Sequence, residues 1–97
     1  MRVRLISRVY ADIESAMGYY LREAGAEYAT KFYEEFKRCR QVIAERPRSF
    51  PIVRDDVRRI NFSRFPYHIL YQITAEDYVK LLAVKHDSRD PDFGLGR

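Results

Sequence analysis

The fold is decided by the stretch from Arg58 to Pro91, RRINFSRFPYHILYQITAEDYVKLLAVKHDSRDP. From Tyr67 to Thr74, aromatic and β-branched residues occupy every second position, and this alternation is typical of a strand with one buried face. The same period predicts a strand from Val57 to Phe62 and another from Tyr78 to Lys85. The polar connections between these segments are short, which favours hairpin turns. We therefore predict an antiparallel three-stranded meander.

Two helices and a strand precede the meander. Apolar residues recur at steps of three and four in residues 8–24 and again in residues 27–45, as on one face of an amphipathic helix. Ser7 is suited to cap the first helix, and Gly25 is suited to end it with a positive φ, so we expect a helical hairpin. Residues 2–7 alternate as a short strand.

These elements predict an α+β fold of two layers in the order β-α-α-β-β-β. The helical hairpin is expected on one face of a mainly antiparallel four-stranded sheet, with the first strand at an edge, parallel to the last strand. Residues 46–56, RPRSFPIVRDD, are predicted to be a connecting loop because Pro47 and Pro51 disfavour regular structure. Residues 89–97 contain Pro91, Gly94 and Gly96 and are expected to form an irregular tail.

Length and composition limit the class of protein and the kind of partner. A chain of 97 residues suits one small domain, and 46% hydrophobic with 33% charged residues argues against both disorder and a membrane protein. We find no secretory signal in the first residues and expect a cytoplasmic protein. The net charge is +4, and its distribution is uneven: residues 36–64 carry nine basic and three acidic side chains. Such a band favours an acidic or polyanionic partner.

The cysteine and the histidines point away from a metal or redox role. Cys39 is the only cysteine, which excludes an internal disulfide, and its place on the inner face of a helix predicts a small buried hydrophobe. His68 and His86 lie on different predicted strands without acidic or cysteine partners at ligand spacing. We expect neither a metal nor a cofactor.

The meander brings a set of basic residues into proximity: Arg58, Arg59, Arg64, His86 and Arg89. Its sequence, RRINFSRFPYHILYQI followed by LLAVKHDSRDPDF, resembles the C-terminal half of the RelE/ParE toxins of bacterial type II toxin-antitoxin (plasmid stabilisation) modules. The predicted helical half fits the same family. The resemblance implies a growth inhibitor that a cognate antitoxin neutralises.

The resemblance leaves the target open between two classes. The motifs RFPY and AV-x-H-x-x-RDP look more like the ParE side, whose members are reported to inhibit DNA gyrase, and this reading makes Arg58, Arg59, Arg64 and Arg89 the target-binding residues. The alternative is a RelE-like, metal-independent cleavage of ribosome-bound mRNA, with Arg64 and His86 as catalytic residues and Arg59 beside them. A non-toxic protein-binding module is the third interpretation.

Tyrosines on the predicted helices point to a protein partner. Tyr10, Tyr19, Tyr28 and Tyr33 add more aromatic surface than one apolar stripe needs. By the resemblance, Tyr19, Tyr28 and Tyr33 would contact the antitoxin, and a homodimer or a heterotetramer with antitoxin is compatible with the family. No membrane partner is expected.

Overall fold

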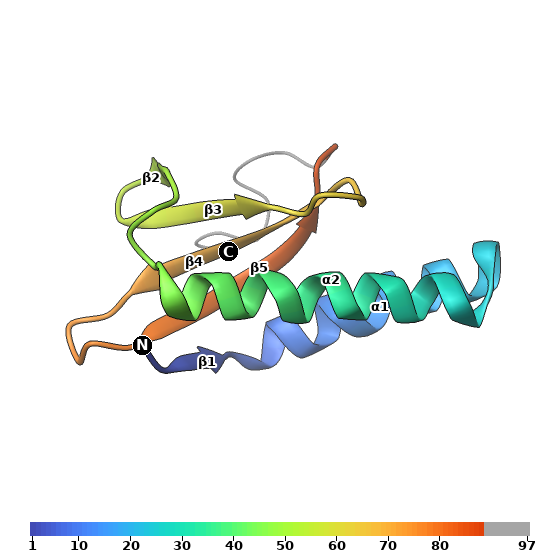
Figure 1. Cartoon of the computed structure of the whole chain (residues 1–97), viewed down its shortest axis with the longest axis horizontal. Coiled ribbons are helices and arrows are strands. Elements are labelled where there is room, and N and C mark those ends of the chain that lie inside the picture. The colour runs from blue at the N-terminus through green and yellow to red at the C-terminus, as the bar shows by residue number, and fades with distance from the viewer. Residues whose placement is uncertain (89–97) are drawn as a thin grey trace.

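The computed structural model describes residues 1–88 and confirms the two-layer α+β architecture (Figure 1). Within this range the elements are β1 Val3–Leu5, α1 Ser7–Ala24, α2 Ala26–Glu45, β2 Ile52–Arg54, β3 Val57–Asn61, β4 Tyr67–Ile73 and β5 Val79–His86. The sheet order is β1-β5-β4-β3-β2. The meander β3-β4-β5 is antiparallel, and β1 pairs with β5 in parallel at one edge, as predicted.

The described sheet has five strands, so the predicted count of four is wrong. The additional strand is β2, which lies inside the segment predicted as a loop and pairs antiparallel with β3. It follows Pro51, whose carbonyl accepts the Arg59 N–H at 3.1 Å. Proline has no N–H to donate to a neighbouring strand, but none is needed at the start of an edge strand. Pro47 and Pro51 are therefore compatible with this short strand. The predicted tail, residues 89–97, lies outside the described residues.

The helical hairpin turns at Gly25, whose φ of 96° favours glycine, and α2 begins at the next residue. This part of the prediction is confirmed. The predicted cap is wrong: Ser7 is the first helical residue, Ile6 occupies the cap position, and no side chain caps the helix there.

The core lies between the helices and the meander. Buried apolar side chains of α1 and α2 form one cluster with those of β3, β4 and β5, including Val9, Phe32, Phe36, Cys39, Ile43, Ile60, Ile69, Tyr71 and Leu81. The Cys39 side chain is fully buried, as predicted, and burial raises the pKa of its thiol to about 11. Cys39 is therefore a packing residue with little thiolate at neutral pH.

A β-bulge in β5 changes which residues face the helices. Leu70 pairs with Ala83 and Tyr71 pairs with Leu81, so Leu82 is an extra residue without a partner on β4. Beyond the bulge Val84 joins the core between sheet and helices. The Val84 N–H donates to the Asp12 carboxylate of α1 at 2.9 Å. The bulge also brings His86 to the side of the sheet that α1 covers.

Candidate functional site

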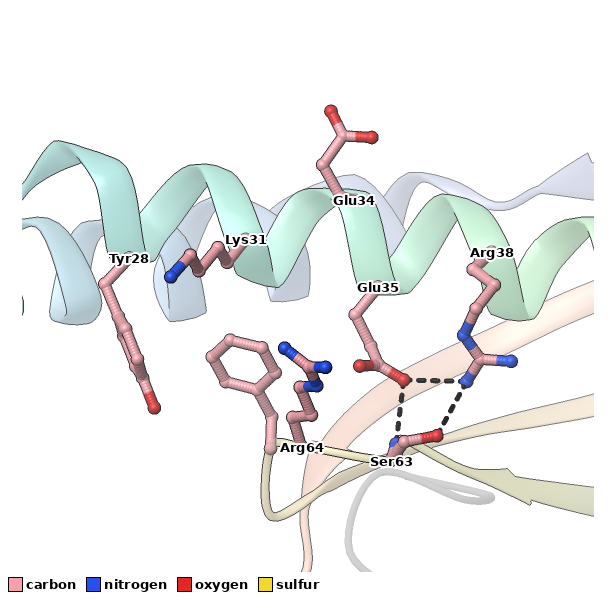
Figure 2. A pocket seen from close by; sticks show the side chains of 8 residues that line it. Tyr28, Lys31, Glu34, Glu35, Arg38, Ser63 and Arg64 are labelled. Carbon is pink, nitrogen blue, oxygen red and sulfur yellow. Dashed lines mark hydrogen bonds and ion pairs between the residues drawn. The ribbon is translucent and has the colours of Figure 1, made fainter.

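A cavity lies between α2 and the turn that joins β3 to β4 (Figure 2). Its volume is about 590 Å³. It is lined by Tyr28, Lys31, Glu34, Glu35 and Arg38 of α2 and by Ser63, Arg64 and Phe65 of the turn. We call it the turn cavity. Sequence reasoning singled out Arg64 and Tyr28 separately, and the structure brings them to the same cavity.

Glu35 connects α2 to the turn. Its carboxylate accepts the Ser63 backbone N–H and an N–H of the Arg38 guanidinium, each at 2.7 Å. The same guanidinium donates to the Ser63 hydroxyl at 3.1 Å, which closes a three-residue network (Figure 2). Charge-assisted hydrogen bonds of this length are among the stronger polar contacts in proteins. The network holds the backbone next to Arg64 at a set position against the helix.

Glu35 remains ionised in this network although its side chain is buried. Burial by itself would raise the pKa of Glu35, but the hydrogen bonds from Arg38 and Ser63 outweigh it and hold the pKa below its ordinary value. The carboxylate is therefore charged at neutral pH and is occupied by its two partners.

Arg64 and Lys31 supply positive charge at the mouth of the cavity. Figure 2 shows the Arg64 side chain rising from the turn toward α2, while Glu34 points away from the cavity. Glu34 lies instead 3.3 Å from the Lys37 ammonium. Among residues 1–88, no hydrogen bond or ion pair engages the Arg64 guanidinium. The cavity thus presents cations that its two carboxylates do not neutralise, because Glu34 pairs with Lys37 and Glu35 is held by Arg38 and Ser63.

Arg58 does not belong to this site, and the prediction that it lies together with Arg64 is wrong. Arg58 stands near the start of β3, whereas Arg64 follows the end of that strand. The Arg58 guanidinium donates to the carbonyl oxygens of Phe50 at 2.7 Å and Arg48 at 3.3 Å. Its contacts hold the loop before β2 against the sheet. Arg89 lies outside the described residues.

Arg59 lies on the sheet face opposite the helices, in a polar cluster that sequence reasoning missed. Its guanidinium is 3.5 Å from the Asp87 carboxylate and 2.8 Å from the Asn61 side chain. The same Asp87 oxygen lies 2.8 Å from Nδ1 of His68. His68 therefore has an acidic partner, Asp87, which the expectation about metal-ligand spacing did not address. The pairing of the strands could have revealed this cluster, because Asn61, His68 and Lys85 are direct neighbours across three strands.

His68 is buried, and burial lowers its pKa below the ordinary value even though Asp87 opposes the shift. The imidazole is therefore neutral at pH 7 and donates its Nδ1 proton to the carboxylate, which can only accept. Lys85 of the same cluster is buried as well. Because His68 and Lys85 are both buried, a substrate has little access to them.

His86 lines two other cavities, one with Arg8, Asp12 and Ser15 of α1 and one with Tyr19 and Arg22. Neither of these cavities is lined by Arg64. The His86 ring stands nearly perpendicular to that of Tyr67, with centroids 5.1 Å apart. Its Nδ1 accepts the Ser88 backbone N–H at 3.1 Å. The two residues predicted as a catalytic pair therefore face different cavities.

The helix tyrosines are exposed to different degrees. Tyr10 and Tyr19 are more than half exposed, at 62% and 51%, while Tyr28 and Tyr33 are 40% and 38% exposed. Tyr28 packs against Phe65 of the turn, with ring centroids 5.2 Å apart. Tyr33 packs on Phe36 and, with Tyr10 and Met17, lines a groove between α1 and α2. The hairpin thus carries partly exposed aromatic surface on more than one side.

Two further observations concern metals and membranes. In the described part of the chain, His, Cys, Asp and Glu side chains form no group of three that suits a metal ion. Neither α1 nor α2 is apolar enough over its length to cross a bilayer.

Comparison with solved structures agrees with this fold. A search of curated protein sequences gave no match. Among solved structures, the chain is similar to one described as the chromosomal ParDE toxin-antitoxin system from P. aeruginosa, with a TM-score of 0.77 and 17% identity over 89% of this chain and 95% of that chain. It is also similar to the isolated E. coli RelE toxin, with a TM-score of 0.62 and 18% identity over 95% of this chain and 89% of that chain.

The family comparison is more specific than these likenesses, which at such identities concern the fold. The family model for the ParE toxin of the type II toxin-antitoxin system, parDE, matches residues 3–91, nearly the whole chain. The sequence resemblance of the meander and the order of the elements agree with that match. The chain therefore belongs to the ParE toxin family, within the wider RelE/ParE group of toxins of type II toxin-antitoxin modules.

Proposed function

We propose that this toxin arrests growth by docking on a protein target, DNA gyrase, and that it does not cleave mRNA. The observation that carries the proposal is that Arg64 and His86 line different cavities. Cleavage at a ribose 2′-OH needs an acid-base group and a cation at the same phosphate, each within hydrogen-bond reach. A cation beside α2 and an imidazole beside α1 suit a docking surface better than proton transfer. Membership of the ParE family supports the same target class.

The polar cluster on the sheet face opposite the helices is the observation that favours the alternative, an mRNA endonuclease. It combines Arg59 with His68, Lys85 and Asp87, and its neutral imidazole has the protonation state of a general base. Burial of His68 and Lys85 weighs against it, because a phosphate has to reach both. Docking through the exposed Arg64 needs no such opening of the structure.

The antitoxin, which the family implies as a partner, is proposed to cover the hairpin tyrosines Tyr19, Tyr28 and Tyr33. Each is partly exposed, and aromatic residues are enriched where protein partners bind. A partner that covers Tyr28 also reaches the turn cavity and Arg64. Antitoxin binding would thereby compete with docking on the target.

The test compares Arg64→Ala and His86→Ala in gyrase supercoiling and RNA cleavage assays. We expect Arg64→Ala to weaken supercoiling inhibition about tenfold, the loss typical of an interface contact worth 1–2 kcal/mol, and His86→Ala to change it by less than about twofold. Arg46→Ala, at an exposed arginine after α2, is the matched control for loss of positive charge. Urea denaturation verifies that each variant is folded.

Cleavage of mRNA by the protein would contradict the proposal. If the wild-type protein fragments ribosome-bound mRNA, and His86→Ala or His68→Ala reduces that cleavage by about 10²- to 10⁴-fold while RNA binding persists, the toxin is a nuclease. If instead neither gyrase nor mRNA responds to the wild-type protein while cells still stop growing, the target assignment is wrong.

A further inference from the structure

We infer that the turn cavity is an anchor site for the antitoxin, and that it receives an apolar or aromatic side chain followed directly by an aspartate or glutamate. The inference deepens the proposed function and rests on its proposal that the antitoxin covers α2. The occupant is a short protein segment in which an acidic residue follows an apolar one. The walls, the charges and the rigidity of the cavity favour such a segment.

The walls are suited to an apolar side chain. Phe65 closes one side and is 6% exposed, and its ring packs on that of Tyr28, whose 40% exposure leaves ring surface open to the cavity. A volume of about 590 Å³ is large enough for one aromatic side chain with its backbone. Burying such a side chain in a preformed recess is the usual source of binding energy at the centre of an interface.

The charges favour a carboxylate next to that side chain. Lys31, Arg38 and Arg64 line the cavity. Of its two lining carboxylates, Glu35 is already held by Arg38 and Ser63, and Glu34 pairs with Lys37. Arg64 has no partner among residues 1–88, and Lys31 has a distant one in Glu27, at 3.9 Å on the surface. One incoming carboxylate at Arg64 would complement this charge.

The same features disfavour nucleic acid as the occupant. Base stacking needs an accessible ring face, and Phe65 is buried, so a single ring, Tyr28, is available. A polyanion also gains from a row of cations, whereas this cavity offers a local charge suited to one carboxylate.

The cavity is organised before the ligand arrives. Two hydrogen bonds to Ser63, one to Glu35 at 2.7 Å and one from Arg38 at 3.1 Å, hold the turn against α2, and a third at 2.7 Å joins Arg38 to Glu35 within the helix (Figure 2). The residue following Ser63 is thereby presented at the cavity mouth. Binding therefore costs little ordering of the turn, which favours selective recognition.

Two dipeptides test the inference by NMR titration of the full-length, isotope-labelled toxin. N-acetyl-phenylalanyl-aspartate amide carries both groups, and N-acetyl-phenylalanyl-asparagine amide lacks the charge. We expect both to shift the amides of Tyr28 and Arg64, with the aspartate peptide binding about fivefold more tightly, as for an ion pair worth about 1 kcal/mol.

Three variants assign the effect to the cavity. Arg64→Met keeps the apolar stem and should remove the fivefold difference between the dipeptides, while Arg46→Met, outside the cavity, should preserve it. Tyr28→Ala should weaken both dipeptides alike. A preference for aspartate that survives Arg64→Met, equal binding of the two dipeptides to the wild-type protein, or shifts confined to other surfaces would overturn the inference.

A dinucleotide, adenylyl-uridine, is the competing probe. If it shifts the same amides at lower concentration than the aspartate dipeptide, the cavity recognises nucleic acid and the inference fails. The growth-arrest and supercoiling assays do not depend on the dipeptides, so a failure here is distinguishable from a failure of the gyrase proposal.

Discussion

At the scale of single residues, Glu35 joins α2 to the turn after β3, a role that its position in the helix does not indicate. It is a buried carboxylate in a stripe of apolar side chains, and a buried charge is tolerated when it is paired and hydrogen-bonded. Its partners are Arg38, one turn along the helix, and the backbone of Ser63 in the turn. Glu34, its neighbour, is exposed and pairs with Lys37 on the surface. The two glutamates form a matched pair for substitution.

We predict that Glu35→Gln lowers the free energy of unfolding by about 1–2 kcal/mol, because hydrogen bonds to a charged acceptor become weaker ones to an amide. Glu34→Gln should change it by less than about 0.5 kcal/mol, since exposed pairs contribute little. Urea denaturation at neutral pH measures both. Equal effects of the two substitutions would show that the network around Ser63 adds nothing to stability.

The low pKa of Glu35 predicts a pH dependence with a definite sign. A carboxyl whose pKa is lower in the folded than in the unfolded state stabilises the fold above the unfolded pKa, and this contribution disappears as the pH falls through the folded pKa. The difference in stability between wild type and Glu35→Gln should therefore be full at neutral pH and shrink below about pH 4.3. Urea midpoints measured at a series of pH values give the curve. A difference that grows toward low pH would contradict the assignment.

At the scale of elements, the helical hairpin depends on one glycine and not on the other. Gly25 has a φ of 96° and separates α1 from α2 by a single residue. Gly18 lies within α1, and an added Cβ there would come within 3.3 Å of the Arg22 guanidinium, the mobile end of an exposed side chain. Backbone conformation therefore determines the effect of a substitution at Gly25, and helix propensity determines it at Gly18.

We predict that Gly25→Ala destabilises the protein by about 1–3 kcal/mol, because the backbone there is strained for any residue with a Cβ, although open space surrounds it. Gly18→Ala should stabilise it by up to about 1 kcal/mol through helix propensity. Thermal denaturation of the two variants should shift in opposite directions. A stabilised Gly25→Ala variant would mean that the helices can join without a positive φ.

The contact between α1 and β5 is a second feature at this scale. β1 pairs with residues 79–81 of β5, and beyond the bulge Asp12 of α1 takes the place of a strand partner for the Val84 N–H. We predict that Asp12→Ala increases the exchange rate of the Val84 amide and lowers stability by about 1 kcal/mol or more, because a buried donor loses its acceptor. Glu14→Ala, at an exposed position of the same helix, is the control. Unchanged exchange at Val84 would rule out the carboxylate as its acceptor.

At the scale of the whole molecule, the sheet has a protected centre and an exposed edge. β4 and β5 have partners on both sides, whereas β2 has three residues, pairs with β3 alone and carries Ile52 and Val53 at 53% and 51% exposure. Local opening is easiest where few contacts have to break.

We predict that native-state hydrogen exchange is slowest at Ile69, Tyr71 and Leu81, with opening free energies close to that of global unfolding. Amides of β2 should exchange orders of magnitude faster, because opening this edge leaves the core intact. NMR-detected exchange gives both sets at once. Protection of β2 equal to that of β4 would mean that the edge is not a separate opening unit.

Several features could be predicted from the sequence because they depend on local pattern. The alternation around Tyr67–Ile73, the helical spacing on both sides of Gly25 and the short connections set the strands, the hairpin and the parallel pairing of β1 with β5. The burial of Cys39 followed from its place on an apolar helix face. β2 was missed since three residues between Pro51 and a turn give too short a pattern to recognise.

The functional surface was decided by contacts between remote segments. Strict alternation from Leu81 would place Lys85 on the helix side, but the bulge at Leu82 turns Lys85 to the opposite sheet face and brings His86 to α1, away from Arg64. Glu35 reaches a turn 28 residues away, and Asp12 reaches a strand 72 residues away. Periodicity specifies which face of an element is apolar. Which polar groups meet depends on bulges, turns and packing that satisfy buried donors, and these are fixed when the elements assemble.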